Sequence, residues 1–455
     1  MSPDRPAGVR RRAVLGAGAA LGLAAPMAGA GALTASADER TSAVRGRHAG
    51  SVRGALSFLG GVTDAYRTTG PRLAQSYQDA SGLTDIAFVY DNALTIIALL
   101  AGGDVKHARA LGDGLLYAQA NDETFTDARL RQAYHADTFV VGDGTREWAH
   151  SGYEFGLVGT AVGDMAWSGI ALAHLAHRTG RRSYLDATLA IGRWIQRNTY
   201  STTGLGGYTF GETAGLEDHK SSEHNLDLTA YFRLLARLTG DAVWRRRADH
   251  AWAFLERVWN DEDGFFWTGS DDGATINKAP AQLPLDVQTW SWLAARERRY
   301  AEALDWARTN LATTDTPLRA NSALTGRQTV HGVVFASGSL TADTDAPIGG
   351  QSYNPEPDDG AVWFEGTGQL AIALRDRRAA GDADRVEDLL GQLRYAQNQL
   401  GRGQTFGGER IEGGIVAASS PMDTGFGFGY YPNLHLAATS WYVFAATGTN
   451  PYRFF

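Results

Sequence analysis

Apolar residues recur at helical spacing along most of the chain, beginning near residue 51 and continuing almost to the end. This periodicity, punctuated by Gly, Asp and Pro, predicts twelve α-helices. The predicted spans are 51–68, 90–102, 104–120, 164–178, 183–198, 223–239, 241–259, 286–297, 299–313, 363–379, 384–399 and 435–447. The pattern therefore predicts an all-α fold.

The predicted helices alternate between two kinds of surface. Six are apolar nearly all round, which is typical of helices buried on every side, and they begin at Asp91, Asp164, Glu223, Asp286, Glu365 and His435. Their partners, such as 241–259, carry a single apolar stripe and belong to an outer layer. Turns such as Thr239-Gly240-Asp241 join an inner helix to the next outer one. We therefore expect an (α/α)6 toroid of six inner and six outer helices, with 51–68 closing the outer ring.

The long connections all precede the predicted inner helices. They span residues 69–89, 121–163, 199–222, 260–285, 314–362 and 400–434. Loops of this length within a compact domain usually carry function, and these are rich in Gly, aromatic and acidic residues. In a toroid they lie on one face, so we expect a cleft over the N-termini of the inner helices.

The first 37 residues have the features of an export signal. Arg10, Arg11 and Arg12 precede an apolar run that ends near Leu33, and Ala35-Ser36-Ala37 fits a cleavage site. The adjacent arginines favour the twin-arginine route, which implies a secreted protein. A membrane anchor is the alternative, but the Gly and Ala content and a proline favour cleavage, and no later stretch is apolar enough to span a bilayer. We expect a signal peptide at 1–37, a linker at 38–50 and a toroid domain at 51–455.

Composition narrows the chemistry. The chain has no Cys, which excludes disulfides, thiol catalysis and thiolate zinc sites. Its net charge is -8 and the proposed signal peptide is itself positive, so the mature protein is acidic and we expect no nucleic-acid partner. No His-Glu-x-x-His run, serine elbow or phosphate loop occurs. We expect the protein to bind neither a metal nor a cofactor. We also expect it to be a monomer.

Several short segments at the expected cleft resemble the six-hairpin glycosidase superfamily, whose members are (α/α)6 toroids. The segments are Tyr90-Asp91-Asn92-Ala93-Leu94, Lys220-Ser221-Ser222-Glu223-His224-Asn225-Leu226-Asp227, Trp363-Phe364-Glu365-Gly366-Thr367-Gly368 and Leu434-His435-Leu436-Ala437-Ala438-Thr439-Ser440-Trp441. The resemblance covers roughly residues 50–450. That superfamily contains hydrolases, epimerases, phosphorylases and polysaccharide lyases, so the resemblance implies a carbohydrate substrate more than a particular reaction.

Glycosidic cleavage needs two carboxyl groups across the bond, one of which is a general acid with a raised pKa. Four of the acids that open inner helices are the catalytic candidates: Asp91, Glu223, Asp286 and Glu365. Helix capping explains any single one of them equally well, and Ser221 with Glu223 could form a capping box. Inversion at the anomeric carbon is the outcome that the resemblance implies.

A second group of residues is expected to contact the sugar. Aromatic faces pack on pyranose rings, and amide, imidazole and carboxyl groups can bind hydroxyls. The substrate-binding candidates are Tyr90, Asn92, Trp148, Tyr153, His224, Asp227, Trp290, Trp363, Tyr430 and His435. Roughly half of the loop aromatics should instead pack within the loops, and a helix-terminal His is more often structural.

These observations support a secreted glycoside hydrolase acting on a poly- or oligosaccharide. A polysaccharide lyase on the same fold is an alternative, with His150, Tyr153 or His224 as base. A non-catalytic glycan-binding envelope protein is another. An epimerase is the least favoured, because the export signal points away from cytoplasmic monosaccharides.

Overall fold

The computed structural model describes residues 29–153 and 156–455, with side chains from residue 46. Most of the proposed signal peptide, residues 1–28, lies outside the described residues. The chain divides into two compact units, Met1–Val44 and Arg45–Phe455. Helix α1 spans Gly29–Thr63, so it begins before the predicted residue 51 and includes residues 38–50, which we predicted as a linker. That stretch contains Ala, Glu and Arg, which favour a helix, and lacks proline.

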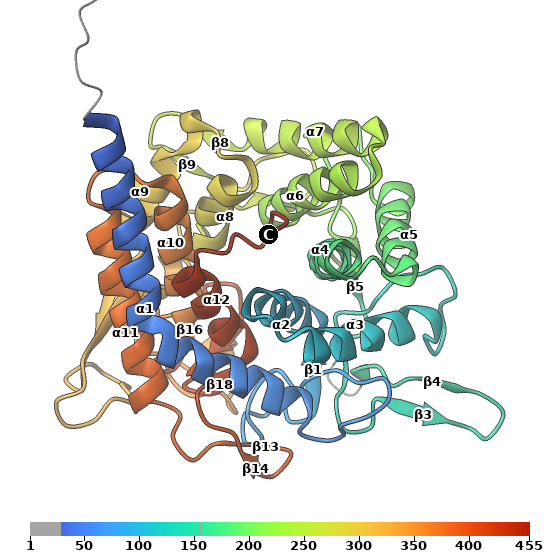
Figure 1. Cartoon of the computed structure of the whole chain (residues 1–455), viewed down its shortest axis with the longest axis horizontal. Helices are drawn as coiled ribbons and strands as arrows, with labels where there is room; N and C mark the ends of the chain where they lie inside the picture. The colour runs from blue at the N-terminus through green and yellow to red at the C-terminus, as the bar shows by residue number, and fades with distance from the viewer. Residues whose placement is uncertain (1–28, 154–155) are drawn as a thin grey trace, which may run out of the picture. The chain divides into compact units, whose positions relative to one another are not determined.

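In the described part of the chain twelve α-helices form two concentric rings (Figure 1). The inner helices are α2 (Val89–Gly102), α4 (Val162–Thr179), α6 (Ser222–Thr239), α8 (Leu285–Ala295), α10 (Phe364–Arg377) and α12 (Leu436–Thr447). Each contacts the next, and α12 contacts α2, which closes the ring. The outer helices are α1, α3 (Val105–Ala120), α5 (Arg182–Asn198), α7 (Ala242–Arg257), α9 (Glu302–Asn310) and α11 (Asp382–Gln399). The predicted (α/α)6 toroid is confirmed.

The predicted closing helix takes its place in the outer ring. Tyr442 of α12 donates its hydroxyl hydrogen to Ser51 Oγ of α1 at 2.8 Å. Gln397 of α11 donates to the backbone oxygen of Ser51 at 3.0 Å. The part of α1 from Arg45 onward therefore lies against both α12 and α11.

The turns between inner and outer helices end and begin helices as predicted. Gly180 and Gly240 follow α4 and α6 with φ angles of 67° and 73°, a left-handed conformation that costs glycine little. Asp104 and Asp241 cap α3 and α7 by accepting hydrogen bonds from the amides of His107 and Val243.

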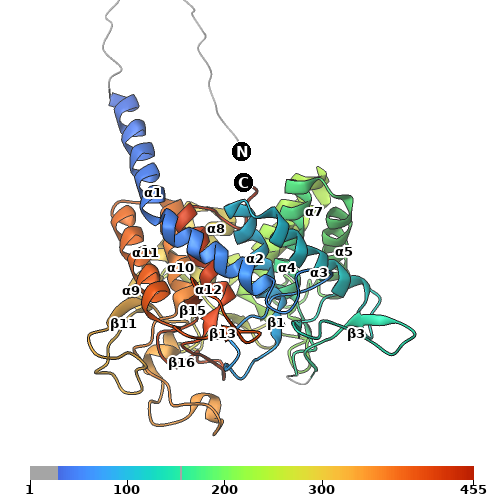
Figure 2. The same cartoon turned by 60° about the horizontal axis from the view of Figure 1, so that its bottom comes forward.

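The long loops contain short pairs of antiparallel strands. The pairs are β1 (Ile86–Phe88) with β2 (Ala133–His135), β3 (Val140–Gly142) with β4 (Glu147–Ala149), β5 (Thr160–Ala161) with β6 (Gly211–Glu212), β7 (Lys220–Ser221) with β10 (Gly269–Ser270), β8 (Trp259–Asn260) with β9 (Phe265–Phe266), β11 (Ala312–Asp315) with β12 (Val330–Val333), β13 (Thr405–Phe406) with β14 (Glu409–Arg410), β15 (Ile415–Val416) with β18 (Leu434–His435), and β16 (Met422–Asp423) with β17 (Gly429–Tyr430). Short 3-10 helices lie at Arg298–Tyr300, Ser337–Thr341 and Ile348–Gly350. Figure 2 shows β1, β3, β13 and β16 on one side of the helices and the C-terminus on the other.

One helix prediction is partly wrong. The span 299–313 divides into a 3-10 turn and the short helix α9, and Ala312–Asp315 then pairs with Val330–Val333 as a strand. The β-branched Thr313 and Thr314 favour this extended conformation. No helix among the residues that the structure describes combines the length and apolarity that a membrane crossing needs.

Inner helices α4 and α6 pack closely at Gly169, which has no side chain. A Cβ added at Gly169 of α4 would lie 2.3 Å from Cζ of Tyr231 on α6. We expect Gly169→Ala to lower the free energy of unfolding by about 1–3 kcal/mol, because the overpacked helices must move apart. In the matched control Gly391→Ala, on outer helix α11, the added Cβ meets nothing within 4 Å. It should raise the free energy of unfolding by about 0.5–1 kcal/mol in urea titrations. Equal effects of the two substitutions would contradict this packing.

Candidate active site

A cavity of about 1070 Å³ opens over the N-terminal ends of the inner helices. Every inner helix contributes at least one titratable side chain at or beside its first turn. These include Asp91 of α2, Asp164 of α4, Glu223 of α6, Asp286 of α8, Glu365 of α10 and His435, the N-cap of α12. The toroid therefore gathers five carboxyl groups and the His435 imidazole from residues up to 344 positions apart in sequence.

Capping does not occupy the carboxyl group of Glu223. Ser221 is the N-cap of α6, and its hydroxyl accepts a hydrogen bond from the His224 amide at 3.3 Å. Glu223 is the second residue of the helix, one position short of the residue that would complete a capping box. Its carboxyl group lies instead at the cavity wall.

Glu365 is held by one of its two carboxyl oxygens. Tyr90 donates its hydroxyl hydrogen to Oε1 at 2.6 Å, and Gln369 donates to the same oxygen at 3.3 Å. Tyr90 is fixed in turn by Trp441, whose Nε1 donates to its hydroxyl at 3.2 Å. Oε2 has no hydrogen-bond partner among the described residues, although the side chain is only 2% exposed. A firmly oriented carboxyl group thus keeps one oxygen available for a ligand or water.

His435 lies between two of the acids. Its Nε2 is 3.2 Å from Asp91 Oδ2, and its Nδ1 is 3.9 Å from Glu365 Oε2. The ring stacks on Tyr77 with centroids 4.2 Å apart and an interplanar angle of 5°. The imidazole is therefore fixed in one orientation, with a hydrogen-bonding atom toward each carboxyl group.

The acids titrate far from their usual range because they are buried together. Burial, followed by repulsion from Asp286, raises the pKa of Glu223 well above its ordinary value. Burial raises the pKa of Glu365 to about 7, although His435 and the Tyr90 hydroxyl favour its ionised form. Burial, with Asp91 nearby, raises the pKa of Asp164 to about 8. Burial therefore favours the protonated form of Glu223, and Glu365 can exchange its proton near neutral pH.

Aromatic rings form the remainder of the wall. Trp290 lies 5.4 Å from Trp167 and 6.4 Å from Tyr90, measured between ring centroids. Trp363 stacks on Tyr430 with centroids 5.5 Å apart. All five side chains line the cavity. Carboxyl groups beside aromatic faces suit a sugar ring, which has hydroxyls at its edge and apolar C–H faces.

The charge of the lining is one-sided. Five carboxyl groups and the imidazoles of His224 and His435 border the cavity, but no Lys or Arg does among the described residues. Burial lowers the pKa of His224 to about 4, so this imidazole is neutral. In the same described part of the chain no group of three or more His, Asp or Glu side chains is arranged to hold a metal ion.

Four predicted sugar-binding residues do not line the cavity. The Asn92 side chain is bonded to the backbone of Ala74, accepting from its amide at 2.8 Å and donating to its oxygen at 3.0 Å. Asp227 is fully buried beneath the cavity. Trp148 lies in the β3–β4 hairpin, and Tyr153 is 73% exposed outside the lining. The other six, Tyr90, His224, Trp290, Trp363, Tyr430 and His435, all border the cavity, as do the four catalytic candidates.

Sequence reasoning missed several lining residues, among them Asp164, Trp167 and Tyr77. Asp164 marked the start of an inner helix, and that position, shared with the other acids, was the signal that could have found it. Trp167 follows one turn later on the same helix. Tyr77 lies in a loop, and nothing in its local sequence indicates that it stacks on His435.

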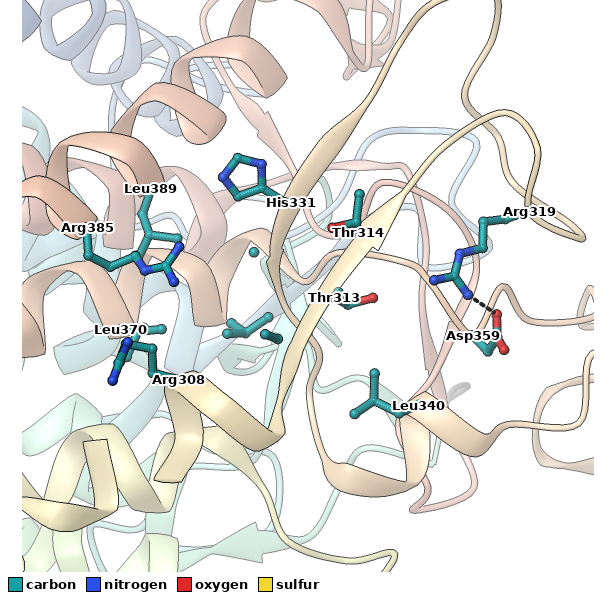
Figure 3. A pocket seen from close by; sticks show the side chains of 13 residues that line it. Arg308, Thr313, Thr314, Arg319, His331, Leu340, Asp359, Leu370, Arg385 and Leu389 are labelled. Atoms are coloured by element: carbon teal, nitrogen blue, oxygen red, sulfur yellow. Dashed lines mark hydrogen bonds and ion pairs between the residues drawn. The ribbon is translucent and has the colours of Figure 1, made fainter. Parts of the chain in front are cut away.

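A second cavity of about 440 Å³ lies among α9, α11 and the β11–β12 hairpin (Figure 3). Its cationic side chains already have acidic partners. Arg319 pairs with Asp359 at 3.0 Å, and His331 and Arg385 pair with Asp388 at 2.9 Å and 3.2 Å. We therefore assign the candidate active site to the larger cavity.

No protein-family model matches the chain, and no curated protein matches it in sequence. Solved structures do match. A GH76 alpha-mannanase of Bacteroides thetaiotaomicron has a TM-score of 0.52 and 12% identity, with 89% of this chain and 96% of that one covered. A cellobiose 2-epimerase of Bacillus thermoamylovorans has a TM-score of 0.55 and 11% identity, with 84% of this chain and 94% of that one covered. A D-mannose isomerase has a TM-score of 0.57 and 10% identity, with 88% of this chain and 96% of that one covered. These low identities establish the architecture alone: the chain has the six-hairpin (α/α)6 toroid fold of these sugar-acting enzymes.

Proposed function

We propose that this protein is a glycoside hydrolase whose substrate is a non-anionic oligo- or polysaccharide. Glu223 is the general acid, and Glu365 is the second carboxyl group. The observation that carries the proposal is the Oε2 atom of Glu365, which has no hydrogen-bond partner among the described residues and lies in a cavity that Glu223 also lines. Export by the twin-arginine route and a monomeric state stay predictions.

The two carboxyl groups can divide the reaction between them. Glu223 gives its proton to the glycosidic oxygen as the bond to the anomeric carbon breaks. Glu365, ionised above its pKa of about 7, accepts a proton from the water that attacks this carbon. Tyr90 holds Oε1 of Glu365, so Oε2 is the oxygen that faces the water. We propose inversion at the anomeric carbon, which NMR of the first-formed product anomer tests.

The negative charge of the lining favours a non-anionic glycan over the uronate-containing polysaccharide that a lyase needs. A uronate carboxylate in the cavity would face five carboxyl groups with no cation to bind it among the described residues. Of the bases proposed for a lyase, only His224 borders the cavity, and its depressed pKa leaves it a weak base. Elimination next to a uronate is therefore disfavoured, because nothing nearby stabilises the developing negative charge.

A panel of glycans tests this proposal. We expect new reducing ends from at least one neutral poly- or oligosaccharide and none from matched polyuronates, with no unsaturated product absorbing in the ultraviolet. Release of unsaturated uronates would contradict the proposal in favour of the lyase. Saturable binding of a neutral glycan without turnover would instead favour the non-catalytic glycan-binding protein.

One observation favours a second candidate, a sugar epimerase or isomerase. His435 is oriented by Asp91 and stacked on Tyr77 at the cavity wall, an arrangement that suits moving a proton to and from carbon. Two of the similar structures are an epimerase and an isomerase. Incubation of reducing sugars in D2O separates the candidates: epimerisation through a carbanion incorporates carbon-bound deuterium without new reducing ends, and hydrolysis does the reverse.

A further inference from the structure

The segment that follows α12, residues 449–455, enters the ring. Figure 1 places the C-terminus at the centre of the inner helices. The Tyr452 side chain is only 3% exposed, and its ring centroid lies 4.9 Å from that of Trp167 and 6.1 Å from that of Trp290. Both tryptophans also line the cavity. Tyr452 thus packs beneath the floor of the candidate active site.

Hydrogen bonds fix this segment at the ends of the inner helices that lie away from the cavity. Asn450 donates from Nδ2 to the backbone oxygen of Leu293 in α8 at 2.9 Å and accepts from the Tyr452 amide at 2.9 Å. His174 of α4 donates from Nε2 to the Pro451 oxygen at 2.8 Å. This imidazole is neutral, because burial lowers its pKa to about 4. The segment therefore joins α4 and α8 and closes this end of the ring.

The Tyr452 hydroxyl makes one contact with the buried acids. It donates to Asp227 Oδ1 at 2.7 Å. Asp227 is fully buried and lies one helical turn after Glu223 on α6. The contact therefore joins the closing segment to the helix turn that carries the proposed general acid.

We propose that Tyr452 is a positioning residue of the active site, which holds the Asp227 carboxyl group beneath Glu223 and supports the aromatic floor. The inference rests on the proposed role of Glu223 as general acid. It assigns the closing segment a task beyond stability, because Asp227 and Glu223 share a helix face.

Loss of the hydrogen bond from Tyr452 should lower the pKa of Glu223. Asp227 faces Tyr452, Glu223 on its own helix, Asp164 of α4 and Asp286 of α8. Burial raises its pKa well above the ordinary value, and the hydrogen bond from Tyr452 favours its ionised form. Removing that donor keeps Asp227 protonated over a wider pH range. Glu223 then has less negative charge beside it, and its pKa falls.

The test is Tyr452→Phe, which removes the hydroxyl and keeps the ring on Trp167 and Trp290. We expect the alkaline limb of the kcat/KM profile to move about one pH unit downward and kcat to fall roughly tenfold, with little change in KM. The matched control is Tyr442→Phe, which removes another buried hydroxyl, bonded to Ser51 of the outer ring. It should leave the profile unchanged.

A readout without substrate separates this inference from the proposed function. The infrared carbonyl band of protonated Glu223, assigned by its loss in Glu223→Gln, reports the titration of this residue directly. A lower midpoint in Tyr452→Phe supports the positioning role even if no glycan is cleaved, in which case only the proposed function fails. An unchanged midpoint overturns the inference even in an active hydrolase. If Tyr452→Phe does not fold, Asp227→Asn replaces it, with the same downward shift expected and the same unchanged midpoint overturning the inference.

Discussion

Replacing Glu223 by Gln should lower kcat for a natural glycan by a factor of about 100 to 10,000, the usual contribution of a general acid. Gln has nearly the same shape, so the fold and sugar binding should persist. The amide cannot give a proton to the departing oxygen, which must then leave as an alkoxide. Reducing-end assays of kcat, with KM and thermal unfolding measured alongside, check this result.

The effect of Glu223→Gln should depend on the leaving group. The nitrophenolate of a nitrophenyl glycoside leaves without protonation, so Glu223→Gln should cleave this substrate with a much smaller loss of kcat. Glu147→Gln is the matched control, because Glu147 is exposed in the β3–β4 hairpin outside the cavity. Equal losses on both substrates, or a change of less than about threefold on the natural glycan, would show that Glu223 is not the acid.

Replacing Glu365 by Gln should cost a similar factor, since an amide cannot take the proton of the attacking water. In the wild type, kcat/KM should rise with pH through about 7, where Glu365 loses its proton. It should fall again at higher pH, as Glu223 loses the proton that the leaving group needs. The pKa of Glu223 lies above its ordinary range for the same reason of burial. The profile is therefore expected to be bell-shaped.

Chemical rescue distinguishes the role of Glu365 from a structural one. Glu365→Ala leaves a space beside the Tyr90 hydroxyl that azide or formate can enter. Recovery of turnover in proportion to the added anion supports a carboxylate acting on water or carbon. If Glu365→Gln kept the acidic limb of the pH profile at the same position, that limb would belong to another group and the assignment would be wrong.

The ring of helices was predictable because its signals are local. The inner helix α4 is apolar on every face and ends at a left-handed Gly180, and both features are visible in sequence. The end of α9 was not predictable, because residues 312–315 form a strand by pairing with residues 330–333. Helical periodicity does not report such a contact. Helix α1 begins earlier than the predicted residue 51, and this start was missed because the stretch before that residue has no apolar stripe that would indicate a helix.

The candidate site was predictable where a residue's position follows from the helix it opens. Asp91, Glu223, Asp286 and Glu365 meet because inner helices begin on one face of a toroid. Asn92 and Asp227 neighbour these acids in sequence, but their side chains turn away from the cavity to the Ala74 backbone and to Tyr452. A single residue along a helix rotates the side chain by about 100°, which separates Asn92 from the lining Asp91. Asp227 shares a helix face with Glu223 but lies one turn further along α6, where it is buried.

A crystal structure of Glu223→Gln with an uncleaved neutral oligosaccharide would show whether the two carboxyl groups flank a glycosidic bond. We expect a glycosidic oxygen within hydrogen-bond distance of the side chain at position 223. We also expect a water molecule between the anomeric carbon and Oε2 of Glu365, with sugar rings against Trp290 and Trp363. A glycan bound elsewhere, or one whose glycosidic oxygen lies beyond the reach of every carboxyl group in the ring, would contradict the proposed function.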